Sequence, residues 1–149
     1  QSLQPIIDRV LAGLSMQIRE RTITVDVNLP KKLPKVLIDE RAIAQVFLNL
    51  IENAIKYNRL SGKVIISARE HEEFIKVDVE DTGIGIPQED IDRIFERFYR
   101  VDKAHSRELG GTGLGLSIVK HMINLHKGEV FAQSKPDEGS IFSFTIPKA

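Results

Sequence analysis

The sequence predicts an α+β fold, in which helices cover one face of a single mixed or mostly antiparallel sheet. Two pairs of strand-like segments are each joined by a short turn, which is typical of antiparallel neighbours. Amphipathic helical segments precede and separate these pairs, and each can bury its apolar stripe against a sheet. The 149 residues suit one globular domain, a size at which roughly 70% of the unfolded surface can be buried.

The N-terminal segment is predicted to be one amphipathic helix that ends at about residue 20. Pro5 can open this helix, and apolar residues then recur at steps of three and four. Gly13 lies inside the helix and weakens it slightly. Residues 23–29 alternate apolar and polar side chains, so a half-buried strand is expected to follow.

The clearest helical pattern begins after Asp39, a residue type favoured as an N-cap, and extends to about Tyr57. Residues 63–70 and 74–80 form the first strand pair, with residues 71–73 as its turn. The remaining predicted elements are, in order, a glycine-containing loop at 81–87, a short helix from about Gln88, a loop at 100–113, a helix from about Leu114 to His126, and strands at 129–134 and 140–146.

Composition excludes several classes of function. Lys plus Arg number 21 and Asp plus Glu number 21, so no net basic field attracts nucleic acid or an anionic membrane. The chain has no cysteine, which excludes disulfides and thiolate metal sites. No apolar run approaches the ~18 residues of a membrane span. We therefore expect a domain that contacts neither nucleic acid nor membrane. We also expect the isolated domain to be a cytoplasmic monomer.

One edge of the helix after Asp39 carries two amides, a cation and an aromatic ring. Asn49 and Asn53 lie about 40° apart on an ideal helix, Lys56 continues their stripe, and Tyr57 borders the apolar face. Amide oxygens suit Mg²⁺, which takes its other ligands from water and substrate phosphates. Lys56 would face those phosphates, and Tyr57 could stack on a purine. A solvated helix face is the alternative reading.

Six of the ten glycines fall in two short runs. In the first, Asp81 ends a strand and is followed by Gly83 and Gly85. A carboxylate only accepts hydrogen bonds, so Asp81 could accept one from an exocyclic amino group such as that of adenine. A turn without a ligand is the alternative.

The second glycine run, residues 110–116, leads directly into a helix. Glycine-lined backbone N–H groups beside the positive end of a helix dipole outline a phosphate site. The run is not a P-loop, because Leu116 stands where the lysine is required. It also lacks the spacing of the dinucleotide fingerprint. A different ATP-binding architecture is indicated.

Four segments together resemble the N, G1, F and G2 boxes of sensor histidine kinases: residues 49–57, 81–85, 95–100 and 111–116. Order and spacing match throughout, and the resemblance covers essentially the whole chain. It is strongest toward the phosphate-responsive and cell-envelope sensor kinases. The resemblance implies the Bergerat-type two-layer α/β sandwich that gyrase-type ATPases and related chaperones share.

The resemblance also implies roles for individual residues. Asn53 would ligate Mg²⁺, and Asn49 and Lys56 would contact the phosphates or the metal shell. Arg100 would approach the γ-phosphate, and Asp81 would read the adenine amino group. The other implied ATP contacts are Tyr57, Gly83, Gly85, Ile86, Tyr99, Gly111, Thr112, Gly113, Leu114, Gly115 and Leu116. Residues 99–111, which include three cations, would form a mobile ATP lid.

Histidine kinases phosphorylate a histidine on a separate helical dimerisation domain, and this sequence contains no match to that acceptor. His71 precedes a glutamate, as the acceptor does, but it falls in a predicted hairpin turn. We expect residues 1–149 to be the catalytic and ATP-binding domain, with residues 1–20 leading from the dimerisation domain. The implied cofactors are ATP and Mg²⁺, and a response regulator would be an indirect partner. The parent would be a membrane-bound sensor with this domain in the cytoplasm.

Three alternatives are weighed against this expectation. A gyrase-type ATP hydrolase needs a carboxylate where Asn49 stands, and Glu52 lies about 80° away round the helix. A non-enzymatic nucleotide sensor or docking module would bind ATP without transferring phosphate. A serine kinase of the same superfamily is the third alternative.

Overall fold

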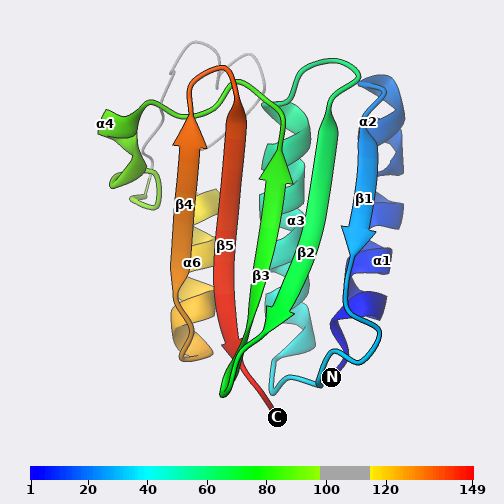
Figure 1. Cartoon of the computed structure of the whole chain (residues 1–149), viewed down its shortest axis with the longest axis vertical. Coiled ribbons are helices and arrows are strands. Elements are labelled where there is room, and N and C mark those ends of the chain that lie inside the picture. The colour runs from blue at the N-terminus through cyan, green and yellow to red at the C-terminus, as the bar shows by residue number, and fades with distance from the viewer. Residues whose placement is uncertain (98–114) are drawn as a thin grey trace.

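The computed structural model describes residues 1–97 and 115–149, and it contains one five-stranded sheet with the order β1-β2-β3-β5-β4. Figure 1 shows the strands in front and the helices behind them. The elements are α1 (Leu3–Gly13), α2 (Ser15–Glu20), β1 (Thr24–Asn28), α3 (Glu40–Lys56), β2 (Lys63–Glu70), β3 (Phe74–Asp81), α4 (Gln88–Ile91), α6 (Gly115–Leu125), β4 (Val130–Lys135) and β5 (Gly139–Pro147).

The sheet is mixed and mostly antiparallel, as the sequence predicted. β1 pairs with β2 in parallel, whereas the β2–β3, β3–β5 and β4–β5 pairs are antiparallel. Both predicted hairpins are confirmed. β5 lies between β3 and β4, so the last strand of the chain joins the two hairpins into one sheet.

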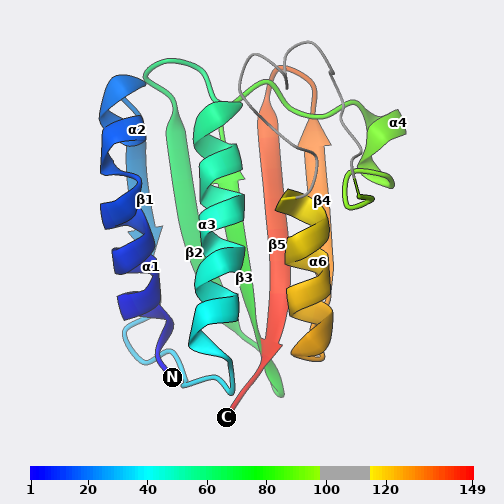
Figure 2. The same cartoon turned by 180° about the vertical axis from the view of Figure 1, so that it is seen from behind.

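The helices α1, α3 and α6 cover one face of the sheet, which Figure 2 shows from the helical side. The strands alternate buried and more exposed residues, and on β3 the buried residues Ile75, Val77 and Val79 are at most 1% exposed. They pack beneath α3, whose Phe47 ring meets the Phe144 ring of β5 edge-on at 5.4 Å. The core is therefore continuous between the two layers.

The Asp39 N-cap is confirmed, because its side chain accepts a hydrogen bond from the Ala42 N–H at 3.1 Å. The prediction of a single N-terminal helix is wrong. The structure has two helices, α1 and α2, which are separated at Leu14 with φ −102° and ψ 8°. The weak helix former Gly13 directly precedes this break. α1 begins two residues before Pro5, at Leu3. Pro5 is tolerated in this first turn because it lacks an N–H, and an N–H there needs no partner within the helix.

Several predictions lie outside the described residues. These are the loop at 100–113, the start of the last helix at Leu114, and the last three residues of the segment 95–100. Within the described part, the last helix begins at Gly115 and ends at Leu125, and Gly128 follows as its stop. The N–H of Gly128 bonds back to the carbonyl of Ile123 at 3.0 Å, which closes the end of α6.

Candidate functional site

Three segments that the sequence nominated converge at one end of α3. They are the C-terminal half of α3, the N-terminus of α6 and the loop at 82–87 that follows β3. The Asn49 side-chain amide donates to the carbonyl of Gly115 at 3.3 Å, which joins α3 to α6. The Ile84 N–H donates to the carbonyl of Tyr57 at 3.1 Å, which joins the loop to the end of α3.

The amide-bearing edge of α3 borders this site. Asn49, Asn53 and Lys56 are half-buried, whereas the opposite stripe of the helix is fully buried in the core. Gln45 donates to the Asn49 Oδ1 at 2.9 Å, so Asn49 is held from the same helix and from α6. Two amide groups thus lie on a rigid helix at the rim of the core.

Lys56 has a partner that the sequence reading did not assign to it. Its Nζ lies 2.7 Å from the Glu52 Oε1, and each side chain is about one-third exposed. An i,i+4 pair of this kind contributes about 0.3–0.5 kcal/mol on a helix surface. An interaction this weak leaves Lys56 able to exchange Glu52 for a more highly charged anion.

The carboxyl of Asp81 has a perturbed pKa. It is only 7% exposed, and desolvation by burial raises the pKa of its carboxyl from 3.8 to about 6. Hydrogen bonds from the backbone of Gly83 and Ser140 lower the pKa in part, and the nearby Glu80 raises it. The Gly83 N–H donates to the Asp81 Oδ1 at 2.9 Å. A buried acceptor with a perturbed pKa is typical of a binding site.

Gly83 and Gly85 are required by packing in this structure. A Cβ at Gly83 would lie 2.2 Å from the carbonyl oxygen of Tyr57. A Cβ at Gly85 would lie 2.1 Å from the carbonyl oxygen of Lys135, and Gly85 has a φ of +74°. From the sequence, these glycines are expected to let the backbone approach a ligand. The structure adds a second reason, because they let the loop lie directly against α3 and β4.

The loop at 82–87 rests on the β4–β5 turn through residues that the sequence analysis missed. The Ile86 N–H donates to the Ser134 Oγ at 2.6 Å, and the Asp137 N–H donates to the carbonyl of Ile84 at 2.7 Å. Ser134 is buried and also donates to the carbonyl of Gly139 at 2.9 Å. A small polar residue on the inward side of a strand was the only signal for this role.

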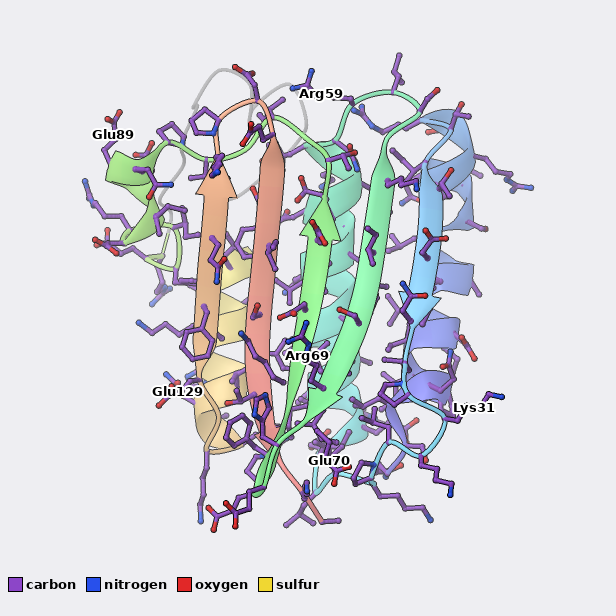
Figure 3. The ribbon with its side chains drawn as sticks, viewed as in Figure 1. Lys31, Arg59, Arg69, Glu70, Glu89 and Glu129 are labelled. Atoms are coloured by element: carbon purple, nitrogen blue, oxygen red, sulfur yellow. The ribbon has the colours of Figure 1, made fainter. Side chains whose placement is uncertain are left out.

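The turn after α3 reaches the same β4–β5 turn. Arg59, labelled in Figure 3, donates from its guanidinium to the carbonyl of Asp137. The loop at 82–87 is therefore held between α3 on one side and the β4–β5 turn on the other. Of the predicted contacts on α6, Gly115 meets Asn49, and Leu116 is half-buried against the core. The remaining predicted contacts, Tyr99, Arg100, Gly111, Thr112, Gly113 and Leu114, lie outside the described residues.

His71 and His126 make contacts outside the candidate site. His71 lies in the β2–β3 turn, as predicted, where its ring stacks on that of Phe74 at 4.7 Å. His126 bonds to the carbonyl of Met122 and accepts from the Asp39 N–H at 3.0 Å. Residues 1–97 and 115–149 contain no group of three His, Cys, Asp or Glu arranged to hold a metal. Amide oxygens on α3 could hold a cation together with the phosphates of a ligand.

The fold is a two-layer α/β sandwich, in which a buried carboxylate ends β3 next to the loop that contacts the C-terminal end of α3. Within that class, the chain belongs to the histidine kinase-, DNA gyrase B- and HSP90-like ATPase family, whose model matches residues 38–149. The fold class and the family resemblance predicted from sequence are thereby confirmed.

Curated relatives are sensor kinases. The sensor histidine kinase WalK of Bacillus subtilis (strain 168) is 48% identical over 122 residues, which are 80% of this chain and 20% of WalK. The sensor-like histidine kinase SenX3 of Mycolicibacterium smegmatis (strain ATCC 700084 / mc(2)155) is 47% identical over 114 residues, which are 76% of this chain and 30% of SenX3. The chain thus spans less than a third of either protein.

Solved structures agree with this assignment. The nucleotide-free catalytic domain of histidine kinase ThkA has a TM-score of 0.86 at 30% identity, covering 99% of this chain and 93% of that one. Full-length ShkA in complex with AMPPNP has a TM-score of 0.86 at 29% identity, and the match covers 100% of this chain and 30% of the ShkA chain. ThkA in complex with the response regulator protein TrrA has a TM-score of 0.82 at 28% identity, and the match covers 100% of this chain and 41% of the matched chain.

Proposed function

We propose that this chain binds Mg-ATP and transfers the γ-phosphoryl group to a histidine on a separate dimerisation domain, as part of a two-component sensor kinase. The observation that carries the proposal is the buried carboxylate of Asp81, which lies at the end of β3, next to the loop that contacts Tyr57 at the C-terminal end of α3. The match to catalytic domains of histidine kinases supports the same reaction.

The base of ATP would bind at Asp81. Its Oδ1 already accepts from the Gly83 N–H, and a carboxylate retains further acceptor sites for the adenine amino group. Tyr57 ends α3 next to this loop and would pack near the adenine and ribose. The exclusion of water around a buried carboxylate strengthens such a hydrogen bond and its selectivity.

The phosphates would lie along α3 toward the N-terminus of α6. Asn53 would hold Mg²⁺ through its amide oxygen, which fits an ion whose other ligands are phosphate oxygens and water. Asn49, one helical turn earlier, would contact the phosphates or the metal shell. When bound, Mg²⁺ would offset charge on the β- and γ-phosphates. Lys56 would exchange Glu52 for a phosphate oxygen. Arg100, which lies outside the described residues, would contact the γ-phosphate.

The chain's own contribution to the reaction would be positioning and electrostatic stabilisation. Phosphoryl transfer needs the nucleophile in line with the leaving oxygen and needs cations around the transferring group. No covalent intermediate on this chain is required. The attacking imidazole, and the base that activates it, would belong to the dimerisation domain.

The test mixes this chain with Mg²⁺, γ-labelled ATP and a separate histidine dimerisation domain of a sensor kinase. We expect label on that domain that is stable to base and lost in acid. Asn53→Ala should reduce transfer by at least about 100-fold, because the metal ligand is lost. Asn124→Ala, on the exposed surface of α6, should leave transfer unchanged. Equal transfer by wild type and Asn53→Ala would contradict the metal role.

The hydrolase alternative is less well supported. Asn49 carries an amide where a water-activating carboxylate is needed, and the nearest carboxylate on the helix, Glu52, pairs with Lys56 at 2.7 Å. Release of free phosphate by the isolated chain, lost in Glu52→Ala, would favour hydrolysis instead.

The partners and location of the parent protein are also part of the proposal. ThkA has been solved with a response regulator, and we infer an analogous regulator as the indirect partner of this chain. Within residues 1–97 and 115–149, no helix has the length and apolar character needed to cross a bilayer. We propose that the parent is a membrane-bound sensor with this domain on the cytoplasmic side.

A further inference from the structure

A buried hydrogen-bonded cluster lies directly behind the proposed adenine end of the site. Its centre is Asn58, which is 4% exposed and follows α3 by two residues. The Asn58 Nδ2 donates to the carbonyl of Lys63 at 2.8 Å, and its Oδ1 accepts from the Arg59 N–H at 2.8 Å and from the Thr82 Oγ1 at 3.0 Å. One amide thus joins the end of α3, the start of β2 and the loop after β3.

Thr82 closes this cluster beside the base-reading carboxylate. Its Oγ1 accepts from the Lys63 N–H at 2.9 Å, and its own N–H donates to the carbonyl of Lys63 at 3.2 Å. Thr82 directly follows Asp81 in the chain. The backbone at Asp81 is therefore fixed from the β2 side by Asn58 and Thr82, which we call the Asn58 cluster.

The side chains of the Asn58 cluster are closely packed against the neighbouring turns. A Cβ at Gly62 would lie 2.2 Å from the Asn58 Oδ1 and 2.8 Å from the Thr82 Oγ1. Two residues of the neighbouring turns have left-handed backbone, Thr22 with φ 55° and Ser61 with φ 61°. A β-branched residue in that region is costly, and it persists only where the surrounding structure determines it.

Arg21 connects the helical lead-in to the same cluster. Its guanidinium donates to the carbonyl of Asn58, and its own carbonyl accepts from the Ser61 N–H at 3.0 Å. A cation at the C-terminal end of a helix is favourable, because it offsets the negative end of the helix dipole of α3. The turn that ends α2 is thereby tied to the end of α3 and, through Asn58, to the loop that follows Asp81.

We infer that Asn58 and Thr82 are specificity-determining positioning residues, which hold Asp81 at the distance from Tyr57 that lets its carboxylate read the amino group of adenine. The inference rests on the proposed function. Neither residue touches the base, and both act through the backbone of residues 81–83. Recognition by a hydrogen bond depends on positions held to within about 0.5 Å, so loss of the cluster should reduce selectivity before it reduces general affinity.

The test compares two nucleotides that differ only in the group that Asp81 would read. ATP carries the exocyclic amino group, and purine riboside triphosphate lacks it. The chain is titrated with each, in the presence of Mg²⁺, and the ratio of the two dissociation constants measures recognition of the amino group. In wild type we expect ATP to bind at least about tenfold more tightly.

Four variants make the test specific. Thr82→Val removes the hydroxyl at constant shape and should lower the ratio by at least about threefold, whereas Thr82→Ser keeps the hydroxyl and should keep the ratio. Thr145→Val removes a hydroxyl that likewise accepts a backbone N–H at 2.9 Å, from Glu129, and should keep the ratio. Gly62→Ala presses on the cluster from outside and should lower the ratio even if Thr82→Val does not fold.

The outcomes separate the inference from the proposed function. A wild-type chain that binds no ATP overturns the proposed function. A wild-type chain that binds ATP without preferring it to purine riboside triphosphate overturns the role of Asp81 and the inference with it. Equal losses for both nucleotides in Thr82→Val, with the ratio unchanged, overturn the inference alone and leave ATP binding intact.

Discussion

Burial determines the chemistry of Asp81. Its pKa of about 6 in the folded chain lies above the ordinary value of 3.8, because desolvation outweighs the two backbone hydrogen bonds. Between these pH values the folded state keeps a proton that the unfolded state has already released. The free energy of unfolding therefore falls as the pH rises from about 4 to 6, and the loss is complete above pH 6. A ligand that donates to the carboxylate would restore part of that loss.

Asp81→Asn should therefore separate stability from binding. At pH 7.5 the variant should unfold with a free energy higher by up to about 3 kcal/mol, because no charge is buried. Its stability should also change less between pH 4 and 7 than that of wild type. Its ATP affinity should fall by roughly 10- to 100-fold, because an amide N–H₂ would oppose the amino group of adenine.

Urea unfolding at several pH values, followed by nucleotide titration at pH 7.5, checks both effects of Asp81→Asn. Asp92→Asn, at an exposed position after α4, is the control and should match wild type in both measurements. If Asp81→Asn kept both the pH dependence of stability and the ATP affinity of wild type, burial would not raise the pKa of Asp81, and Asp81 would not contact ATP.

At the scale of the elements, periodicity predicted most of what the structure contains. The stripe on α3, the two hairpins and the Asp39 cap each depend on local pattern, so each could be predicted. The break at Leu14 could not be predicted from periodicity, because a helical period continues across it. The sequence also nominated Asp81 and the asparagines by motif. It could not identify Asn58 or Ser134, because each contacts the loop after β3 across a long stretch of chain: Asn58 accepts from the Thr82 side chain, and Ser134 accepts from the Ile86 N–H.

Gly13 and Gly83 illustrate the same limit, because alanine should change the stability of the chain in opposite directions at these two positions. Gly13→Ala should stabilise the chain by about 0.5–1 kcal/mol, since Gly13 is helical and a Cβ there meets nothing within 4 Å. Gly83→Ala should destabilise it by about 1–3 kcal/mol, because the Cβ would meet the carbonyl of Tyr57. Thermal unfolding of both variants checks this. Changes of the same sign would contradict the packing role of Gly83.

At the scale of the molecule, the candidate site and the core share one helix. α3 buries one stripe against the sheet, and its other edge carries the asparagines that would hold the metal and phosphates. Figures 1 and 2 show α3 in the middle of the helical layer, between α1 and α6. α3 contacts α1, α6 and the strands β2 and β3. A ligand bound along α3 therefore depends on the folded state of the whole chain, and its binding energy adds to the free energy of unfolding.

Mg-ATP should consequently raise the unfolding temperature of the entire chain in one transition. At a free concentration of 100 times the dissociation constant, binding adds about 2.7 kcal/mol, which corresponds to roughly 5–10 °C for a domain of this size. Chelation of Mg²⁺ by EDTA should remove part of the shift in wild type. In Asn53→Ala the smaller remaining shift should be insensitive to EDTA, because the metal ligand is absent. Differential scanning calorimetry checks both, and a shift in wild type that is identical with and without Mg²⁺ would argue against a metal-bridged nucleotide on α3.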